Sequence, residues 1–210
     1  MNRVLLVDED PAFRLGLCKL LEAALPTLTI VETESFANAK VLLREVPGIA
    51  LVIMDMKLRD CGGFVGLFEM RSEFPEVPII VLSTIEDPDS ASRAVAFGAP
   101  GYISKSAPCE AIVQTVKTIL SGRPWAHGSV AARAGQGNPI ATLSRTQLRV
   151  LAGLKRGLRN KQIAFEMGVT EKTVKSYMST LYRKLGVNSR TQALILLQEV
   201  LSNTQLQQVS

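Results

Sequence analysis

The chain has 210 residues, of which 47% are hydrophobic, and this length suits one large or two small domains. No apolar run reaches the roughly 18 residues of a membrane span. We therefore expect a cytoplasmic protein without a signal peptide. The net charge of +5 is unevenly spread, since residues 1–121 hold 11 Lys and Arg against 16 Asp and Glu, whereas residues 122–210 hold 13 against 3. The chain has a single histidine, which argues against a His-based catalytic triad or a His-rich metal site. Its three cysteines lack metal-type spacing and are expected to be reduced thiols.

The acidic first half alternates strands and helices. Short apolar runs predict strands over 4–7, 29–31, 51–55, 79–82 and 102–103. Apolar residues at helical spacing predict helices that start at Asp10-Pro11 and at Pro108, and others over 37–46, 64–74 and 90–97. Five strand–helix repeats imply a parallel sheet with helices on both faces, a doubly wound α/β fold of the flavodoxin-like (βα)5 kind.

Polar residues stand where the predicted strands end. Asp8 and Glu9 follow the first strand, Asp55 ends the third, Ser83 ends the fourth and Lys105 follows the fifth. The second strand contributes none, as expected if it lies at an edge. Because ligands of such sheets bind at the carboxyl ends of the strands, we expect these side chains to lie together.

This set of residues predicts phosphoryl-transfer chemistry. An isolated strand-end aspartate more often caps a loop, but three neighbouring acids need a cation, and Mg²⁺ suits oxygen ligands. A carboxylate beside Mg²⁺ and Lys105 can accept a phosphoryl group, with Ser83 donating to one of its oxygens. No residue looks like an independent general base, so we predict a phosphoryl acceptor and not an enzyme.

The basic second half is predicted to be a linker followed by helices. Residues 122–142 contain four Gly and two Pro and are predicted to be the linker. In residues 143–210, Ser144 and Gln147 form a possible capping box, and the first helix stops at Gly157. Further helices are predicted over 160–167, 171–185 and 191–201, with Gly168-Val169-Thr170 as a tight turn.

The helix over 171–185 has two distinct faces. Val174, Met178, Leu181 and Leu185 form a core stripe at 100° per residue. The opposite side carries cations that attract phosphates and short hydroxyls that can approach base edges: Lys172, Lys175, Ser176, Ser179 and Arg183. A solvated charged face is the alternative, but the scarcity of acids favours a DNA-binding helix-turn-helix.

Four motifs resemble the receiver domain of two-component response regulators over residues 1–121: Val7-Asp8-Glu9-Asp10-Pro11, Asp55, Ser83 and Gly98 through Lys105. The resemblance implies phosphorylation of Asp55, Mg²⁺ held by Asp8, Glu9, Asp55 and the backbone carbonyl of Lys57, and phosphoryl-binding or switch roles for Ser83, Thr84, Tyr102 and Lys105. Three residues differ from those usual in the family: Lys57, Thr84 and Arg59, the last of which stands where proline is usual. These differences are expected to affect the metal affinity and the lifetime of the phosphorylated state.

The stretches 160–175 and 183–191 are similar to the LuxR-type helix-turn-helix, so the chain as a whole resembles the NarL/FixJ subfamily. Gln147 stands where glutamate is common. The resemblance implies pairing of two subunits through residues 191–201. It implies base contacts from Lys175, Ser176 and Ser179, and contacts at or near phosphates from Lys161, Lys172, Thr173, Tyr177, Arg183 and Lys184.

The resulting prediction is a response regulator transcription factor. A sensor histidine kinase would supply the phosphoryl group, and the phosphorylated homodimer would bind promoter DNA. One alternative is a pseudo-receiver that regulates DNA binding by dimerisation without phosphorylation. A second is a stand-alone aspartyl-phosphate phosphatase, which the lack of a second acid or base and the attached helix-turn-helix disfavour.

Overall fold

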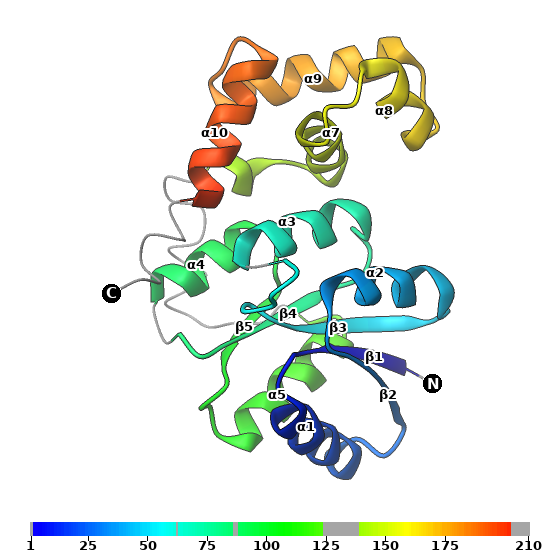
Figure 1. The fold of residues 1–210 in the computed structure, drawn as a ribbon, viewed down its shortest axis with the longest axis vertical. Helices are drawn as coiled ribbons and strands as arrows, with labels where there is room; N and C mark the ends of the chain where they lie inside the picture. The colour runs from blue at the N-terminus through cyan, green and yellow to red at the C-terminus, as the bar shows by residue number, and fades with distance from the viewer. Residues whose placement is uncertain (1, 62, 86–87, 124–138, 203–210) are drawn as a thin grey trace. The chain divides into compact units, whose positions relative to one another are not determined.

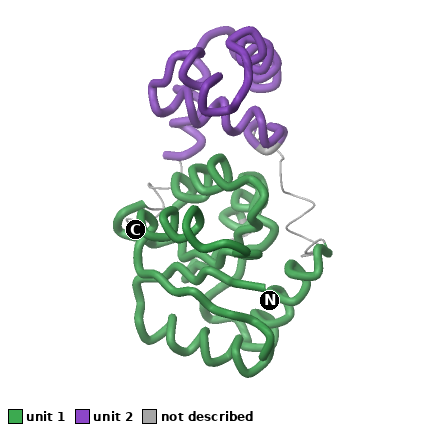
Figure 2. Tube along the Cα trace, turned by 90° about the vertical axis from the view of Figure 1, so that its right-hand side faces the viewer, with its two compact units in different colours: residues 1–134 green, residues 135–210 purple. Residues whose placement is uncertain are grey.

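The computed structural model describes residues 2–61, 63–85, 88–123 and 139–202. The chain divides into two compact units, Met1–Ala134 and Gly135–Ser210 (Figure 2). Most of the predicted linker over 122–142, including His127, lies outside the described residues, as does the end of the predicted domain, 203–210. None of the helices described is long and apolar enough to cross a membrane.

The first unit is built on a five-stranded parallel sheet, as predicted. Its strands run in the order β2-β1-β3-β4-β5, so the second strand does lie at an edge. The chain reverses its direction of winding between β1 and β3, which is where doubly wound sheets bind ligands at the strands' carboxyl ends. The strands are β1 (Asn2–Val7), β2 (Leu28–Thr33), β3 (Ile49–Asp55), β4 (Ile79–Ser83) and β5 (Gly101–Ser104).

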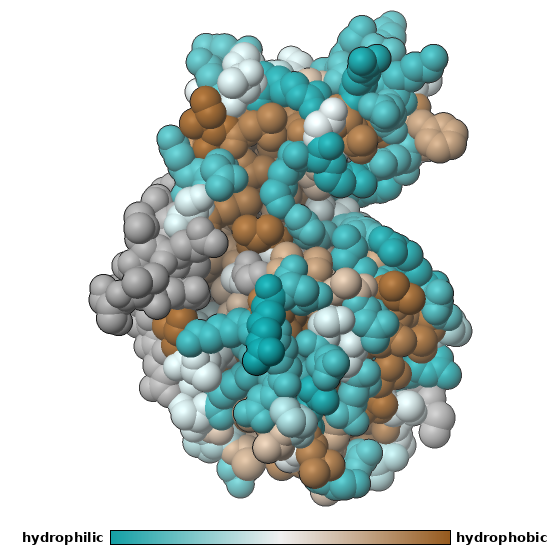
Figure 3. All heavy atoms as spheres, in the orientation of Figure 1, coloured by the Kyte–Doolittle hydropathy of each residue, from teal (hydrophilic) through white to brown (hydrophobic). Residues whose placement is uncertain are grey.

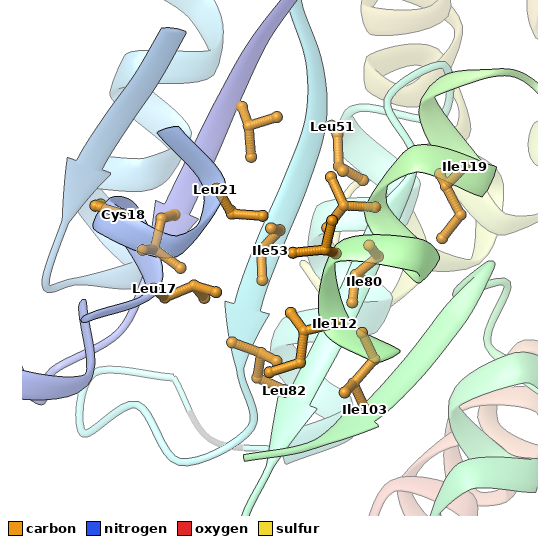
Figure 4. Packing of buried hydrophobic residues seen from close by; sticks show 14 residues of the cluster. Leu17, Cys18, Leu21, Leu51, Ile53, Ile80, Leu82, Ile103, Ile112 and Ile119 are labelled. Carbon is orange, nitrogen blue, oxygen red and sulfur yellow. The ribbon is translucent and has the colours of Figure 1, made fainter. Parts of the chain in front are cut away.

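Helices cover both faces of this sheet. The helices α1 (Pro11–Ala24) and α5 (Cys109–Leu120) lie on one face, and α2 (Phe36–Glu45), α3 (Gly63–Glu73) and α4 (Pro88–Ala96) lie on the other (Figure 1). Under α1 and α5 the apolar side chains of the helices interlock with those of the central strands, among them Leu21, Ile53, Ile80 and Ile112 (Figure 4). Full burial of such a side chain stabilises the fold by about 1.5–3 kcal/mol.

Short side chains fix where the first helices begin. The carboxylate of Asp10 accepts from the N–H groups of Ala12 at 2.9 Å and Phe13 at 3.2 Å, which confirms the predicted start of α1. The start of α2 has two caps: Ser35 accepts from Asn38 N–H, and Asp60 accepts from the N–H groups of Phe36 at 3.0 Å and Ala37 at 2.9 Å. The second cap comes from the loop after β3 and was not predicted.

The second unit contains the 3-10 helix η1 (Pro139–Thr142) and helices α7 (Arg145–Lys155), α8 (Asn160–Met167), α9 (Glu171–Leu185) and α10 (Arg190–Ser202). Ile140 of η1 is buried, and the Lys184 ammonium donates to the carbonyl of Thr142 at 2.7 Å. The last four residues of the predicted linker therefore pack as part of the helical unit.

The predicted capping box at the start of α7 is confirmed. Ser144 Oγ accepts from Gln147 N–H at 3.3 Å, and Gln147 Oε1 accepts from Ser144 N–H at 2.9 Å. The amide group of the buried Gln147 also donates to Thr180 Oγ1 at 3.3 Å. Gln147 thus joins the start of α7 to α9, and a carboxylate at this position could not donate that last bond.

A left-handed glycine makes the turn between α8 and α9. Gly168 ends α8 with φ of 67°, a conformation that a side chain would strain. Two residues later Thr170 Oγ1 accepts from Thr173 N–H at 3.1 Å and begins α9. The predicted helix, tight turn and long helix are present as one continuous motif.

The three cysteines are free thiols. Cys18 is buried in the core beneath α1, and burial, followed by the charge of Glu32, raises the pKa of its thiol to about 12. Cys18 therefore remains a neutral, inert thiol at physiological pH. Cys61 is partly exposed and Cys109 is exposed at the start of α5.

Candidate functional site

The carboxyl ends of β1, β3 and β5 bring together three of the predicted site residues. Asp8 directly follows β1, Asp55 is the last residue of β3 and Lys105 directly follows β5. The register pairs Asp55 with Leu82, one residue before Ser83 on β4. Asp8 is fully buried and Asp55 is only 6% exposed, so both carboxylates depend on partners within the protein.

The ammonium group of Lys105 is the partner that both carboxylates share. Its Nζ lies 2.6 Å from Asp8 Oδ2 and 2.8 Å from Asp55 Oδ2. The same nitrogen lies 4.7 Å from the centre of the Phe13 ring, a cation–π distance that helps to fix its position. One lysine thus joins the ends of β1 and β3 to the end of β5.

Backbone N–H groups hold the remaining oxygens of these two carboxylates. Asp10 N–H donates to Asp8 Oδ1 at 2.9 Å, and Lys57 N–H donates to Asp55 Oδ1 at 3.0 Å. Hydrogen bonds to an ionised carboxylate favour the charged form and fix its orientation. Both oxygens of Asp55 therefore have a hydrogen-bond donor, whereas Asp8 Oδ2 has only the ion pair with Lys105 and, among the described residues, no hydrogen bond.

The electrostatics of the cluster are unbalanced. Burial raises the pKa of Asp8, and the contacts with Lys105 and with Asp10 N–H offset that shift only in part. Burial alone would lower the pKa of Lys105, but hydrogen bonds with Asp55 and Asp8 outweigh it and raise that pKa above its usual value. Two carboxylates share a single cation, so additional positive charge at this position would be favourable.

Glu9 is turned toward a different partner. The backbone N–H of Arg59 donates to Glu9 Oε1, and Arg59 Nε lies 3.0 Å from Glu9 Oε2. Within the described parts of the chain, no three acidic, histidine or cysteine side chains are grouped so that they could hold a metal ion. The structure thus brings Asp8 and Asp55 together, whereas Glu9, the third predicted carboxylate ligand, contacts Arg59.

Ser83 and Tyr102 meet at a single residue of the loop after β4. The buried Ser83 Oγ accepts from Ile85 N–H at 3.0 Å. The Tyr102 hydroxyl donates to Ile85 O at 2.8 Å, and its ring is buried. Ile85 thus connects the predicted phosphoryl-binding hydroxyl to the predicted switch tyrosine, whereas the side chains of Lys57 and Thr84 are exposed.

The helical unit presents the predicted polar face to solvent. Val174, Leu181 and Leu185 of α9 are buried, and Met178 is half-buried at the edge of this stripe. Hydrophilic residues gather over α8 and α9 (Figure 3). The side chains exposed on or beside the predicted DNA-binding face are Lys161, Lys172, Lys175, Ser176, Ser179, Arg183 and Lys184.

Several of these residues also have partners within the unit. Lys175 Nζ lies 3.2 Å from Glu171 Oε1 in an exposed pair, which contributes little to stability and can open. Thr173 is half-buried, and its hydroxyl shares a hydrogen bond with that of Thr170 at 2.8 Å. Tyr177 is also half-buried. Thr173 therefore has a capping role in addition to the predicted phosphate contact.

Sequence analysis did not predict the contacts of Phe13, Arg59 and Asp60. Phe13 lies about one turn after Asp8, Glu9 and Asp10, and this position is the sequence signal that could have placed it near Lys105. Arg59 stood out as a departure from the resembled family, but its contact with Glu9 joins residues fifty positions apart. No local pattern reveals such a contact.

Comparison with known proteins matches both units. Residues 4–117 match the response regulator receiver domain, and residues 141–197 match the bacterial regulatory proteins of the luxR family. The glycerol metabolism activator of Pseudomonas putida is 28% identical, over 93% of this chain and 94% of that protein. The DNA-binding transcriptional activator DevR/DosR of Mycobacterium tuberculosis is 32% identical, over 95% of each chain.

A solved structure of the Salmonella typhimurium RcsB response regulator resembles the whole chain. It has a TM-score of 0.57 at 21% identity, and the match covers 95% of this chain and 100% of that one. At this identity the likeness concerns the fold alone.

Proposed function

Because the chain belongs to the two-component response regulators of the NarL/FixJ type, which join a receiver domain to a LuxR-type DNA-binding domain, we propose that a phosphoryl group on Asp55 controls its binding to DNA. The proposal is supported above all by the position of the Lys105 ammonium, which lies 2.6 Å from Asp8 and 2.8 Å from Asp55 at the carboxyl ends of the strands. We assign the receiver to residues 1–121, the linker to 122–138 and the DNA-binding domain to 139–210.

In the proposed reaction a carboxylate oxygen of Asp55 attacks the phosphorus of a phosphohistidine on a sensor kinase. An oxygen–phosphorus bond forms, the phosphorus–nitrogen bond breaks, and the histidine nitrogen leaves with the electron pair. Lys105 offsets charge on the transferred group. Asp8, Asp55, the Lys57 carbonyl and, once it leaves Arg59, Glu9 would hold Mg²⁺, whose charge would stabilise the phosphoryl oxygens.

We further propose that Ser83 and Tyr102 respond to the phosphoryl group. The Ser83 hydroxyl accepts from Ile85 N–H, so its own proton remains available for a phosphoryl oxygen. A shift of Ser83 would reach Tyr102 through Ile85, since the tyrosine donates to the carbonyl of that residue. Thr84 is exposed next to Ser83 and would border the same oxygens.

For the helical unit we propose sequence-specific binding in the major groove by α9. Lys175, Ser176 and Ser179 would contact base edges, and the surrounding residues Lys161, Lys172, Thr173, Tyr177, Arg183 and Lys184 would lie at or near phosphates. The promoter would be bound by a homodimer paired through α10, whose Ile195 is 53% exposed.

The coupling of the two activities is tested by measuring DNA affinity in both states. DNA selected from a random duplex library is titrated with the full-length protein, with and without a small acyl phosphate and Mg²⁺. We expect phosphorylation to raise the affinity by roughly 5–150-fold, the usual range for coupling between sites. Unchanged affinity on complete phosphorylation would favour regulation by dimerisation alone.

Substitutions on α9 should separate base contacts from phosphate contacts. Lys175→Ala should weaken binding to the selected DNA by about 1–3 kcal/mol and relax the preference at one base pair. Lys172→Ala should weaken binding to all sequences alike and reduce the salt dependence by about one phosphate contact. Binding isotherms at several salt concentrations give both values.

The control for these two variants is Lys19→Ala, which removes one positive charge from the exposed face of α1 in the first unit. It should leave DNA affinity and its salt dependence unchanged. If Lys175→Ala behaves like this control, α9 does not read bases in the proposed orientation.

A further inference from the structure

Arg59 engages both oxygens of Glu9. Its backbone N–H donates to one of them, and its guanidinium Nε lies 3.0 Å from the other. These contacts join the loop after β3 to the residue that follows Asp8. The Glu9 side chain is 24% exposed, so it has room to turn, whereas the buried Asp8 and Asp55 carboxylates are fixed.

The consequence is that two of the three predicted carboxylate ligands of the metal lie together and the third does not. Asp8 and Asp55 face the same Lys105 nitrogen, but no group of three ligating side chains exists within the described ranges. For Glu9 to join the two aspartates, directly or through water, its carboxylate must give up the contacts with Arg59. The positive charge of the guanidinium also disfavours a divalent cation nearby.

We propose that Arg59 competes with Mg²⁺ for Glu9 and lowers the affinity of the receiver for the ion, so that phosphoryl transfer responds to the free Mg²⁺ concentration. This rests on the proposed function of the site. Arg59 is a positioning residue, because it acts through Glu9 and not on the phosphoryl group. The Arg59 side chain is 93% exposed, so water can replace Glu9 as its partner at small cost.

The two parts of the Arg59 contact can be removed in two steps. Alanine removes the guanidinium and keeps the N–H, whereas proline removes both, since it has no N–H to donate. We expect Arg59→Ala to tighten Mg²⁺ binding about threefold, the size of an exposed ion pair. We expect Arg59→Pro to tighten it about tenfold, because the hydrogen bond from the backbone to the carboxylate is lost as well.

The measurement is calorimetric titration of the full-length, unphosphorylated protein with MgCl₂. Arg3→Ala is the matched control for net charge, since Arg3 lies at the opposite end of β1, where it donates to the Pro47 carbonyl. In a Glu9→Gln background the Arg59→Ala substitution should have little further effect, because the competed carboxylate is gone. That double-mutant cycle separates competition for Glu9 from a general effect of charge.

The outcomes distinguish this inference from the proposed function. Tighter binding in both Arg59 variants, lost in the Glu9→Gln background, supports the competition. Equal Mg²⁺ affinity in the wild type and both Arg59 variants overturns it and leaves phosphoryl transfer to Asp55 intact. The same gain with or without the Glu9 carboxylate also overturns it. If no variant binds the ion, both the magnesium proposal and the competition are wrong.

Discussion

Replacing Asp55 by asparagine should abolish phosphorylation of the chain. With a small acyl phosphate and Mg²⁺, the wild-type protein should gain the mass of one phosphoryl group and the variant should gain none. The amide differs from the carboxylate by one atom, keeps an oxygen for Lys57 N–H and has a similar volume, so the fold should persist. It lacks the anionic oxygen that attacks phosphorus.

The matched control is Asp60→Asn, because Asp60 lies in the same loop but caps α2. Asparagine keeps one of the two oxygens that accept from α2, and because position 60 is exposed, water can bind the other N–H, so this variant should fold and accept phosphate normally. Hydroxylamine provides a second check, since it cleaves an acyl phosphate but not a phosphoserine or phosphothreonine. Equal labelling of Asp55→Asn, or a label resistant to hydroxylamine, would assign the acceptor to another residue.

Replacing Lys105 by methionine should lower the free energy of unfolding of the first unit by about 3–5 kcal/mol, the usual cost of removing one partner of a buried ion pair. Asp8 and Asp55 would then face each other without their shared cation. Denaturant unfolding of the full-length chain measures the change. Added Mg²⁺ should restore more stability to the variant than to the wild type, because the ion would replace the missing charge.

Lys57→Met is the control for Lys105→Met. It removes an exposed lysine from the same edge of the sheet and should change the free energy of unfolding by less than about 0.5 kcal/mol. If both variants lose equal stability, the loss reflects the net charge of the unit and not the contact of Lys105 with the two aspartates.

The fold could be predicted from sequence because its signals are local. Short apolar runs followed by polar residues alternated with segments of helical periodicity, and this alternation predicts a parallel sheet covered by helices. The cap at Asp10, the capping box at Ser144 and the turn at Gly168 each depend on residues within three positions of one another. All of them were predicted where they occur.

The site was predicted only as far as the strand ends determine it. Parallel strands bring their carboxyl ends to one edge, so Asp8, Asp55 and Lys105 could be expected to meet. Which carboxylate takes which cation depends on loop conformation, and the attachment of Glu9 to Arg59 has no local signature.

The end of the linker was missed for a related reason. The dipeptide Asn138-Pro139 favours a loop in the sequence, and the glycines before it extend that signal. Ile140 is nevertheless buried within the helical unit, and Lys184 donates to the carbonyl of Thr142. Contacts with residues more than forty positions away decide the boundary, and no pattern of neighbouring residues contains them.

The hydrogen bonds of Ile85 suggest how phosphorylation at the end of β3 could change the conformation of the loop after β4. Its amide is committed to Ser83 and its carbonyl to Tyr102, so one peptide segment carries both attachments. A displacement of the serine would reach the tyrosine through two hydrogen bonds and the backbone of one residue. In the proposed mechanism the segment from Ser83 to Ile85 would act as a short lever that changes the position of the Tyr102 ring.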